Sequence, residues 1–161
     1  MHPMHPLRPL LPSDLEELVE VYRDAVLSQA RGLYSPEQIA AWADHAGRGA
    51  GLAAALQGGW GLASLGDTPA GGIEAFALLD PLDRLSLLYC RGRSCRQGRA
   101  TALLQAVQAE ARRRGINRLR TEASQLSRPL LERLGWQLDA EEEVRFAGVL
   151  FRRWRMIRPL N

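Results

Sequence analysis

Apolar side chains recur along this chain with two spacings, one typical of helices and one typical of strands. The first helix is indicated by apolar residues at the i, i+3, i+4, i+7 and i+11 positions of one face: Leu15, Leu18, Val19, Tyr22 and Val26. Ser13-Asp14-Leu15-Glu16, at the start of this pattern, has the serine and glutamate of a capping box. The pattern therefore predicts a helix that begins at Ser13.

Further helices are predicted from caps and from apolar stripes. Ser35-Pro36-Glu37-Gln38 combines a capping serine, a proline at the first helical position and a glutamine that completes the box. Residues 99–114 carry the longest apolar stripe, and Gly115 ends that helix behind a run of arginines. A short helix is predicted over residues 127–134. The Gly- and Ala-rich residues 46–59 are compatible with one more short helix.

Short apolar runs bounded by Gly, Pro and Asp predict the strands. They cover residues 7–11, 60–65, 73–79, 85–90, 116–121, 136–138, 144–149 and 151–157. The strands within residues 60–90 follow one another through short turns, so we expect them to be antiparallel. Residues 116–121 follow a helix, so that strand is expected to run parallel to its predecessor.

Together these elements predict an α/β (α+β) fold in one domain over residues 1–161. Its mixed, mostly antiparallel sheet should have about six to seven strands flanked by helices. Composition agrees with a folded domain, since 46% of the 161 residues are hydrophobic and 24% are charged. No apolar run approaches the ~20 residues of a membrane span, and the first residues lack the shape of a signal peptide. We therefore expect a cytoplasmic protein that binds no membrane.

Charge and cysteine content argue against two further classes of function. The net charge of +3 rests on arginine alone, because the chain has no lysine. Acidic residues are interleaved with these arginines, a pattern that does not favour binding of nucleic acid. Cys90 and Cys95 are too few for a metal site without neighbouring histidines. We expect two free thiols and no metal.

The stretch Arg93 to Leu104 joins the apolar strand 85–90 to the longest helix and is the best candidate for a binding site. Its centre alternates small residues, Gly98, Ala100 and Ala102, where larger side chains would crowd a ligand. A strand, a small-residue turn and a helix start gather unpaired N–H groups around one point. With the helix dipole and with Arg93, Arg96 and Arg99, they predict a cradle for phosphate, most simply a pyrophosphate. The alternative is an ordinary turn with a solvated basic face.

Several segments make the chain resemble the GNAT N-acetyltransferase superfamily over nearly its whole length. Cys95-Arg96-Gln97-Gly98-Arg99-Ala100 is similar to the family signature Gln/Arg-x-x-Gly-x-Gly/Ala, with Cys95 in place of Gln or Arg. Leu88-Tyr89-Cys90 resembles its Leu-Tyr-Val segment, and residues 129–136 resemble Phe-Tyr/Phe-Glu-Arg-x-Gly-Phe. Residues 34–42, similar to Tyr-Ser-x-Glu-Gln-x-x-Ala-Trp, and the closing residues 148–160 resemble one bacterial subgroup.

The resemblance implies acetyl-CoA as cosubstrate, with its pyrophosphate on main-chain N–H groups of Arg96 to Ala100 and its pantetheine arm along Leu88 to Cys90. The implied cofactor-binding residues are Leu88, Tyr89, Cys90, Cys95, Arg96, Gln97, Gly98, Arg99, Ala100 and Thr101. Because a backbone N–H does not depend on the side chain, Cys95 need not abolish this site. By the same resemblance Tyr34 and Trp42 line the acceptor pocket; alternatively, Trp42 is simply core.

Acetyl transfer to an amine needs a neutral amine, an N–H donor for the oxyanion and help for the leaving thiolate. The family commonly supplies an acid from a tyrosine, but Leu131 occupies that position. Tyr89 and Ser124 are the catalytic hydroxyl candidates, with Ser127 and Tyr34 behind them; otherwise the thiolate leaves unaided. Glu74, in an apolar strand, is the candidate base if burial raises its pKa; otherwise it points outward.

The sequence thus predicts an acetyl-CoA-dependent N-acetyltransferase that acts on a primary amine of a small molecule or peptide, by direct attack in a ternary complex. Asp83, Glu122 and His45 are weaker candidates for the base. The competing classes are a catalytically idle acyl-CoA-binding module and a small basic protein that binds nucleic acid. A homodimer is compatible with this reading. The loops over residues 27–36 and 44–59, which should select the acceptor, carry no recognisable code.

Overall fold

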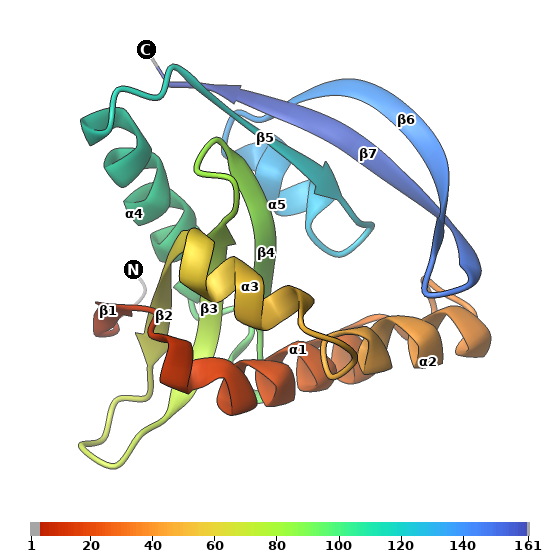
Figure 1. Ribbon diagram of the computed structural model, residues 1–161, viewed down its shortest axis with the longest axis horizontal. Coiled ribbons are helices and arrows are strands. Elements are labelled where there is room, and N and C mark those ends of the chain that lie inside the picture. Colours follow the sequence, from red (N-terminus) through yellow and green to blue (C-terminus); the bar gives the residue numbers. More distant parts are fainter. Residues whose placement is uncertain (1–3, 161) are drawn as a thin grey trace.

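The structure, a computed structural model, describes residues 4–160. Seven strands form one open sheet in the order β1-β2-β3-β4-β5-β7-β6, with helices on both faces (Figure 1). The elements in chain order are β1 (Leu7–Pro9), η1 (Pro12–Asp14), α1 (Leu15–Gln29), α2 (Pro36–His45), α3 (Gly51–Gly58), β2 (Trp60–Leu65), β3 (Ile73–Leu79), β4 (Arg84–Cys90), η2 (Gly92–Ser94), α4 (Arg99–Arg113), β5 (Arg118–Ala123), α5 (Arg128–Arg133), β6 (Gln137–Phe146) and β7 (Val149–Pro159), where η marks a 3₁₀ turn.

Strand directions follow from the connections, as predicted. Every neighbouring pair in the sheet is antiparallel except β4 and β5, which are parallel because α4 crosses between them. The predicted mixed, mostly antiparallel sheet flanked by helices is confirmed. None of the helices within residues 4–160 is both long and apolar enough to cross a membrane.

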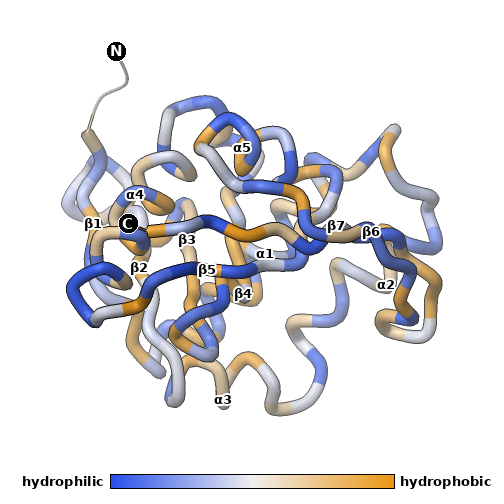
Figure 2. The backbone as a smooth tube through the Cα atoms, turned by 90° about the horizontal axis from the view of Figure 1, so that it is seen from above, coloured by the Kyte–Doolittle hydropathy of each residue, from blue (hydrophilic) through white to orange (hydrophobic). Residues whose placement is uncertain are grey.

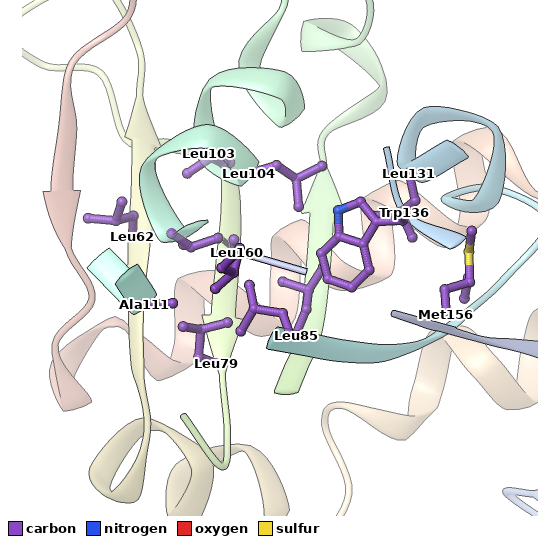
Figure 3. Packing of buried hydrophobic residues seen from close by; sticks show 14 of the residues in the cluster. Leu62, Leu79, Leu85, Leu103, Leu104, Ala111, Leu131, Trp136, Met156 and Leu160 are labelled. Atoms are coloured by element: carbon purple, nitrogen blue, oxygen red, sulfur yellow. The ribbon is translucent and has the colours of Figure 1, made fainter. Parts of the chain in front are cut away.

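Two helical layers enclose the sheet. Seen from above, α4 and α5 lie on one side of the strands and α3 on the other (Figure 2). Leu103 and Leu104 of α4 and Leu131 of α5 pack into one cluster on the sheet, in which Leu131, Trp136 and Met156 lie together (Figure 3). Residues of α1, α2 and α3 pack on the opposite face with Phe76 and Phe151. Both faces of the central strands are therefore buried.

The beginning of the first helix differs from the prediction. Ser13 does not cap it: residues 12–14 form the 3₁₀ turn η1, and α1 begins at Leu15. The Asp14 carboxylate turns back to accept the Leu11 N–H at 2.8 Å and two hydrogen bonds from Arg8 at 2.9 Å. This local network ends β1 early and leaves the capping-box pattern unused.

The C-terminal strands also differ from the prediction. The segments predicted at 136–138 and 144–149 belong largely to one ten-residue strand, β6, which a tight turn with positive φ at Ala147 and Gly148 joins to β7. The acidic residues between the two predicted segments are mostly exposed on this edge strand, and Glu142 accepts a hydrogen bond from Arg153 of β7 at 2.8 Å. Cross-strand ion pairs thus replace the apolar alternation that signals a strand.

Candidate active site

The parallel strands β4 and β5 diverge soon after they begin. They pair only through Arg84 with Arg120 and Leu85 with Thr121. Just beyond, an extra residue, Ser86, bulges from β4 between its pairs with β3. A cavity of about 1270 Å³ follows the divergence and is lined from both strands, from α1 and α2, and from the start of α4. The separation of two strands in the middle of the sheet thus opens this cavity.

One edge of β4 faces this cavity with unused backbone groups. Arg91 donates its N–H to the Glu74 carbonyl at 2.8 Å, on the side of β3. Since antiparallel residues alternate in the direction of their backbone groups, Leu88 and Cys90 direct theirs away from β3, toward β5. The Cys90 carbonyl accepts a hydrogen bond from Gln29 Nε2 at 2.7 Å. The remaining groups of Leu88 and the Cys90 N–H can pair with an extended ligand.

The turn between β4 and α4 presents a row of N–H groups. Arg96 has φ 61° and Gly98 has φ 79°, and left-handed residues in such a turn direct successive N–H groups to one side. Ala102 is the first residue of α4 whose N–H finds an acceptor, the Gly98 carbonyl at 3.0 Å. No acceptor within the described part of the chain takes the N–H groups of residues 96–101. These groups, at the positive end of a fifteen-residue helix, suit a phosphate or pyrophosphate.

The arginines around this turn do not all face it, contrary to expectation. Arg99 is buried and donates to Ser64 Oγ and to the Leu65 carbonyl, both at 2.9 Å, so it anchors α4 to β2. Its Nε binds the Gln97 side chain, which does not line the cavity. Arg96 lines the cavity and has no acidic partner among residues 4–160. It is the cation that this turn leaves available.

Glu74 is not the raised-pKa base that the sequence suggested. Its side chain is buried on β3 and accepts hydrogen bonds from Arg93 Nε at 3.0 Å and Nη2 at 2.7 Å, and another from Ser94. Arg93 holds the pKa of Glu74 down at about 2, against the opposing effect of burial. Glu74 also lies outside the cavity lining. The predicted base with a raised pKa and the alternative, a carboxylate that points outward, are therefore both wrong.

Both cysteines are free thiols in the cavity wall, as predicted. The Cys90 thiol donates to the Ser94 carbonyl at 3.3 Å, and the Cys95 thiol to the Arg91 carbonyl at 3.5 Å. Burial, and then the neighbouring Cys95 thiol, raise the pKa of Cys90 to about 12. Both side chains therefore fold back on the turn, and neither replaces the donor that a Gln or Arg would supply.

An aromatic cluster brings together Tyr34 and Trp42, the two residues predicted for the acceptor side, with the catalytic candidate Tyr89. Trp42 Nε1 donates to the Tyr89 hydroxyl at 3.0 Å. The ring centroids of Tyr34 and Trp42 are 5.2 Å apart, and the Phe151 ring lies 6.0 Å from that of Tyr34, tilted by 45°. Trp42 is both core and cavity wall, since it is 7% exposed and still lines the cavity. Burial raises the pKa of Tyr89 to about 12, so its hydroxyl keeps its proton at neutral pH.

Ser124 lies across the cavity, at the entry to α5, where its hydroxyl already has partners. It accepts the N–H groups of Leu126 at 3.1 Å and Ser127 at 3.3 Å. The Tyr34 hydroxyl accepts a hydrogen bond from the Gln125 N–H at 2.9 Å. This bond links the segment just before α2 to the loop just before α5. Leu131, in the position of the expected tyrosine, is buried in the core beside the cavity.

Sequence reasoning missed the residues of α1 that hold the end of β4. Gln29 binds the Cys90 carbonyl, and Asp24 Oδ1 accepts the Gly92 N–H at 2.8 Å. These contacts join positions more than sixty residues apart, and no local pattern marks them. Glu122, a weaker candidate, does line the cavity, where Arg84 binds its Oε1 at 3.0 and 2.7 Å. Among residues 4–160 no cluster of His, Cys, Asp and Glu is suited to a metal.

Comparison with known proteins agrees with this geometry. A family model described as an acetyltransferase (GNAT) domain matches residues 31–158. The GCN5-related N-acetyltransferase of Rhodopseudomonas palustris is 26% identical with a TM-score of 0.91, over 99% of this chain and 98% of that one. No protein with curated annotation matches the chain.

Two solved structures with bound ligand have the same fold. PaiA N-acetyltransferase of Thermoplasma acidophilum, solved with coenzyme A, is 17% identical with a TM-score of 0.78, over 98% of this chain and 99% of that one. A phosphinothricin acetyltransferase of Sinorhizobium meliloti, solved with acetyl-CoA, is 18% identical with a TM-score of 0.68, over 98% and 89%. At such identities the likeness is one of fold.

Proposed function

This chain belongs to the GNAT family of acetyltransferases, and from that premise we propose that it moves an acetyl group from acetyl-CoA to a primary amine of a small molecule or peptide. Acetyl-CoA supplies the acetyl group as an activated thioester. A carbon–nitrogen bond forms, the carbon–sulfur bond breaks, and the proton lost by the amine is balanced by the one gained by the thiol. The amine attacks directly, with both substrates bound at once.

The observation that carries this proposal is the row of unused N–H groups at residues 96–101. The first N–H groups of a helix have no acceptor within the helix, and they are commonly satisfied by a capping side chain, by water or by a ligand. No side chain caps α4. Here left-handed φ at Arg96 and Gly98 directs them to the cavity at a helix N-terminus. Arg96 adds a full charge, and the small Ala100 leaves room for the phosphates. These residues fit the pyrophosphate of CoA.

The open edge of β4 fits the pantetheine arm. The backbone groups of Leu88 and the Cys90 N–H can pair with its amides as an added strand would. Because Gln29 already donates a hydrogen bond to the Cys90 carbonyl, that acceptor is not open to the pantetheine arm. Pairing between the arm and β4 would therefore end at the Cys90 N–H. The arm would then lie between β4 and β5, along the cavity.

Tyr89 is the better of the two candidate acids. Because its oxygen accepts the Trp42 N–H, its own proton remains free to be donated. Its raised pKa keeps that proton in place at neutral pH, which suits a donor to a thiolate and does not suit a base. The Ser124 oxygen instead accepts N–H groups at the start of α5, which makes it first of all a cap.

We assign the base to no side chain. The Arg93 partnership excludes Glu74, and the Arg84 hydrogen bonds keep Glu122 ionised and engaged. Of the weaker candidates, Asp83 accepts a hydrogen bond from Arg120, and the His45 ring lies at the cavity wall with its centroid 4.3 Å from that of Phe146. We therefore expect the amine to lose its proton to water in the cavity. Tyr34 and Trp42 form the apolar wall against which the acceptor would lie.

Release of free thiol from acetyl-CoA tests the transfer against the alternative of an idle acyl-CoA-binding module. Purified protein is assayed with amino acids, polyamines, aminoglycosides, arylamines and peptides, while calorimetry measures CoA binding. We expect amine-dependent thiol release. Binding of CoA without release for any amine would favour the idle module, and failure to bind CoA would overturn both.

A further inference from the structure

The cavity wall opposite α4 and α5 carries an excess of arginine. On β5 and β7, Ala123 and Trp154 belong to the cluster that packs under α4 and α5. Strand residues alternate between faces, so the preceding Glu122 and Arg153 project to the other face, where Phe151 packs against Trp42. Both line the cavity there. This is the face on which an acceptor would meet the tip of the pantetheine arm.

The acidic groups near this wall are already neutralised. Glu122 is the one carboxylate that lines the cavity within residues 4–160, and Arg84 binds it. Arg153 gives Nε and Nη2 to a single oxygen of Glu142 on β6, at 2.8 and 2.7 Å, so its Nη1 is left without a partner in the described chain. Arg48, which is exposed at the cavity rim after α2, has no acidic partner in the described chain. The wall therefore offers the unbound Nη1 of Arg153 and the guanidinium of Arg48, while its one carboxylate is already bound to Arg84.

This charge distribution discriminates between amines. A polyamine or an aminoglycoside would bring several positive charges against arginines, with no acidic group to receive them. An amine that also carries a carboxylate would find the partner that Arg153 and Arg48 leave open. The apolar faces of Tyr34, Trp42 and Phe151 lie beside this position. They suit an aliphatic or aromatic side group.

We propose that the acceptor is an α-amino acid with an apolar or aromatic side chain, whose carboxylate is bound by Arg153 at the cavity wall, with Arg48 at the rim. The inference rests on the proposed function, since it names the substrate class of that transfer. The α-amino nitrogen forms the bond to the acetyl carbon, the bond from that carbon to sulfur breaks, and the products are the N-acetyl amino acid and the CoA thiol.

Matched pairs of amines test this. Thiol release from acetyl-CoA is measured with L-phenylalanine against phenethylamine and with L-leucine against isoamylamine, each pair differing only by the carboxylate, and with spermidine. The amino acids are expected to have kcat/KM higher than their carboxylate-free counterparts by about 10- to 100-fold, the value of a hydrogen bond between charged groups. Arg153→Gln should bring the kcat/KM of L-phenylalanine down to that of phenethylamine, mainly through a higher KM for the amino acid.

The control is Arg145→Gln, which removes an exposed arginine of β6 outside the cavity and should change nothing. Equal or better turnover of phenethylamine, isoamylamine or spermidine would overturn the inference and leave the acetyl transfer standing. An unchanged preference in Arg153→Gln would overturn the role of Arg153. Absence of thiol release with every amine, although CoA binds, would instead overturn the transfer itself and this inference with it.

Discussion

Arg93 donates two hydrogen bonds to the Glu74 carboxylate, from Nε at 3.0 Å and from Nη2 at 2.7 Å. The carboxylate belongs to β3 and the guanidinium to the turn that follows β4, so this pair fixes the start of the proposed CoA site to the sheet. Glu74, a charged residue inside an apolar strand, therefore has a structural role, and its pKa is lowered instead of raised.

Glu74→Gln should lower the free energy of unfolding at neutral pH by about 1–3 kcal/mol, because it weakens a buried hydrogen-bonded group. Since the folded-state pKa of about 2 lies below the ordinary 4.5, the ionised carboxylate stabilises the protein above pH 4.5, and this contribution is lost as the pH falls toward 2. Urea unfolding across that range should show wild type and variant converging. A constant difference at all pH values would contradict the pairing.

Gly92→Ala should destabilise the turn after β4. A Cβ at Gly92 would lie 2.6 Å from Ser28 Oγ and 2.7 Å from its Cβ, on helix α1. Relieving such a clash typically costs about 1–3 kcal/mol. Gly51→Ala is the control, because nothing lies within 4 Å of its Cβ at the first position of α3. Thermal unfolding should show a Tm below that of wild type for Gly92→Ala only. A wild-type Tm for Gly92→Ala would mean that Ser28 of α1 does not pack closely against this turn.

Tyr89→Phe should lower kcat by about 10²–10⁴-fold, the usual contribution of a general acid, with little effect on CoA affinity. Ser124→Ala, examined in the same kinetics, would show the larger loss if the other hydroxyl were the acid. Unchanged kcat in both would mean that the thiolate leaves unaided. The measurement is initial-rate kinetics on a responsive amine.

Alkylation of Cys90 by iodoacetamide should be slow near neutral pH and accelerate as the pH rises toward about 12, because burial keeps the thiol protonated. Mass spectrometry of the alkylated peptides follows each cysteine separately. Saturating CoA should slow the alkylation of both Cys90 and Cys95, since both thiols line the cavity. Rapid alkylation of Cys90 at pH 7 would show that the thiol is exposed or activated.

Much of the fold could be predicted because its signals are local. The strands β2 and β3 have the predicted bounds, since apolar runs between Gly and Asp mark them without ambiguity. The acidic strand β6 was only partly predicted, because its stability depends on arginines of β7. The capping box at Ser13 failed for a similar reason: Asp14 bonds to Arg8 and Leu11 instead.

The candidate site shows the same division. The small-residue turn and its positive φ follow from Gly98 and the helix that begins behind it, so the phosphate cradle could be expected from sequence. The roles of the arginines could not. Arg99 binds Ser64, thirty-five residues away, and Arg93 binds Glu74, nineteen away, and no spacing along the chain indicates either contact.

Calorimetric titration of CoA into wild type, Ala100→Asp and Ala102→Asp tests the central claim most directly. Both variants add one negative charge to the first turn of α4, where the helix dipole tolerates it, but Ala100 lines the cavity and Ala102 is exposed outside it. A pyrophosphate on the N–H groups of residues 96–101 predicts that Ala100→Asp weakens CoA binding at least about tenfold, through like-charge repulsion, while Ala102→Asp binds nearly as wild type does. Equal affinities for all three proteins would contradict the placement of CoA at this turn.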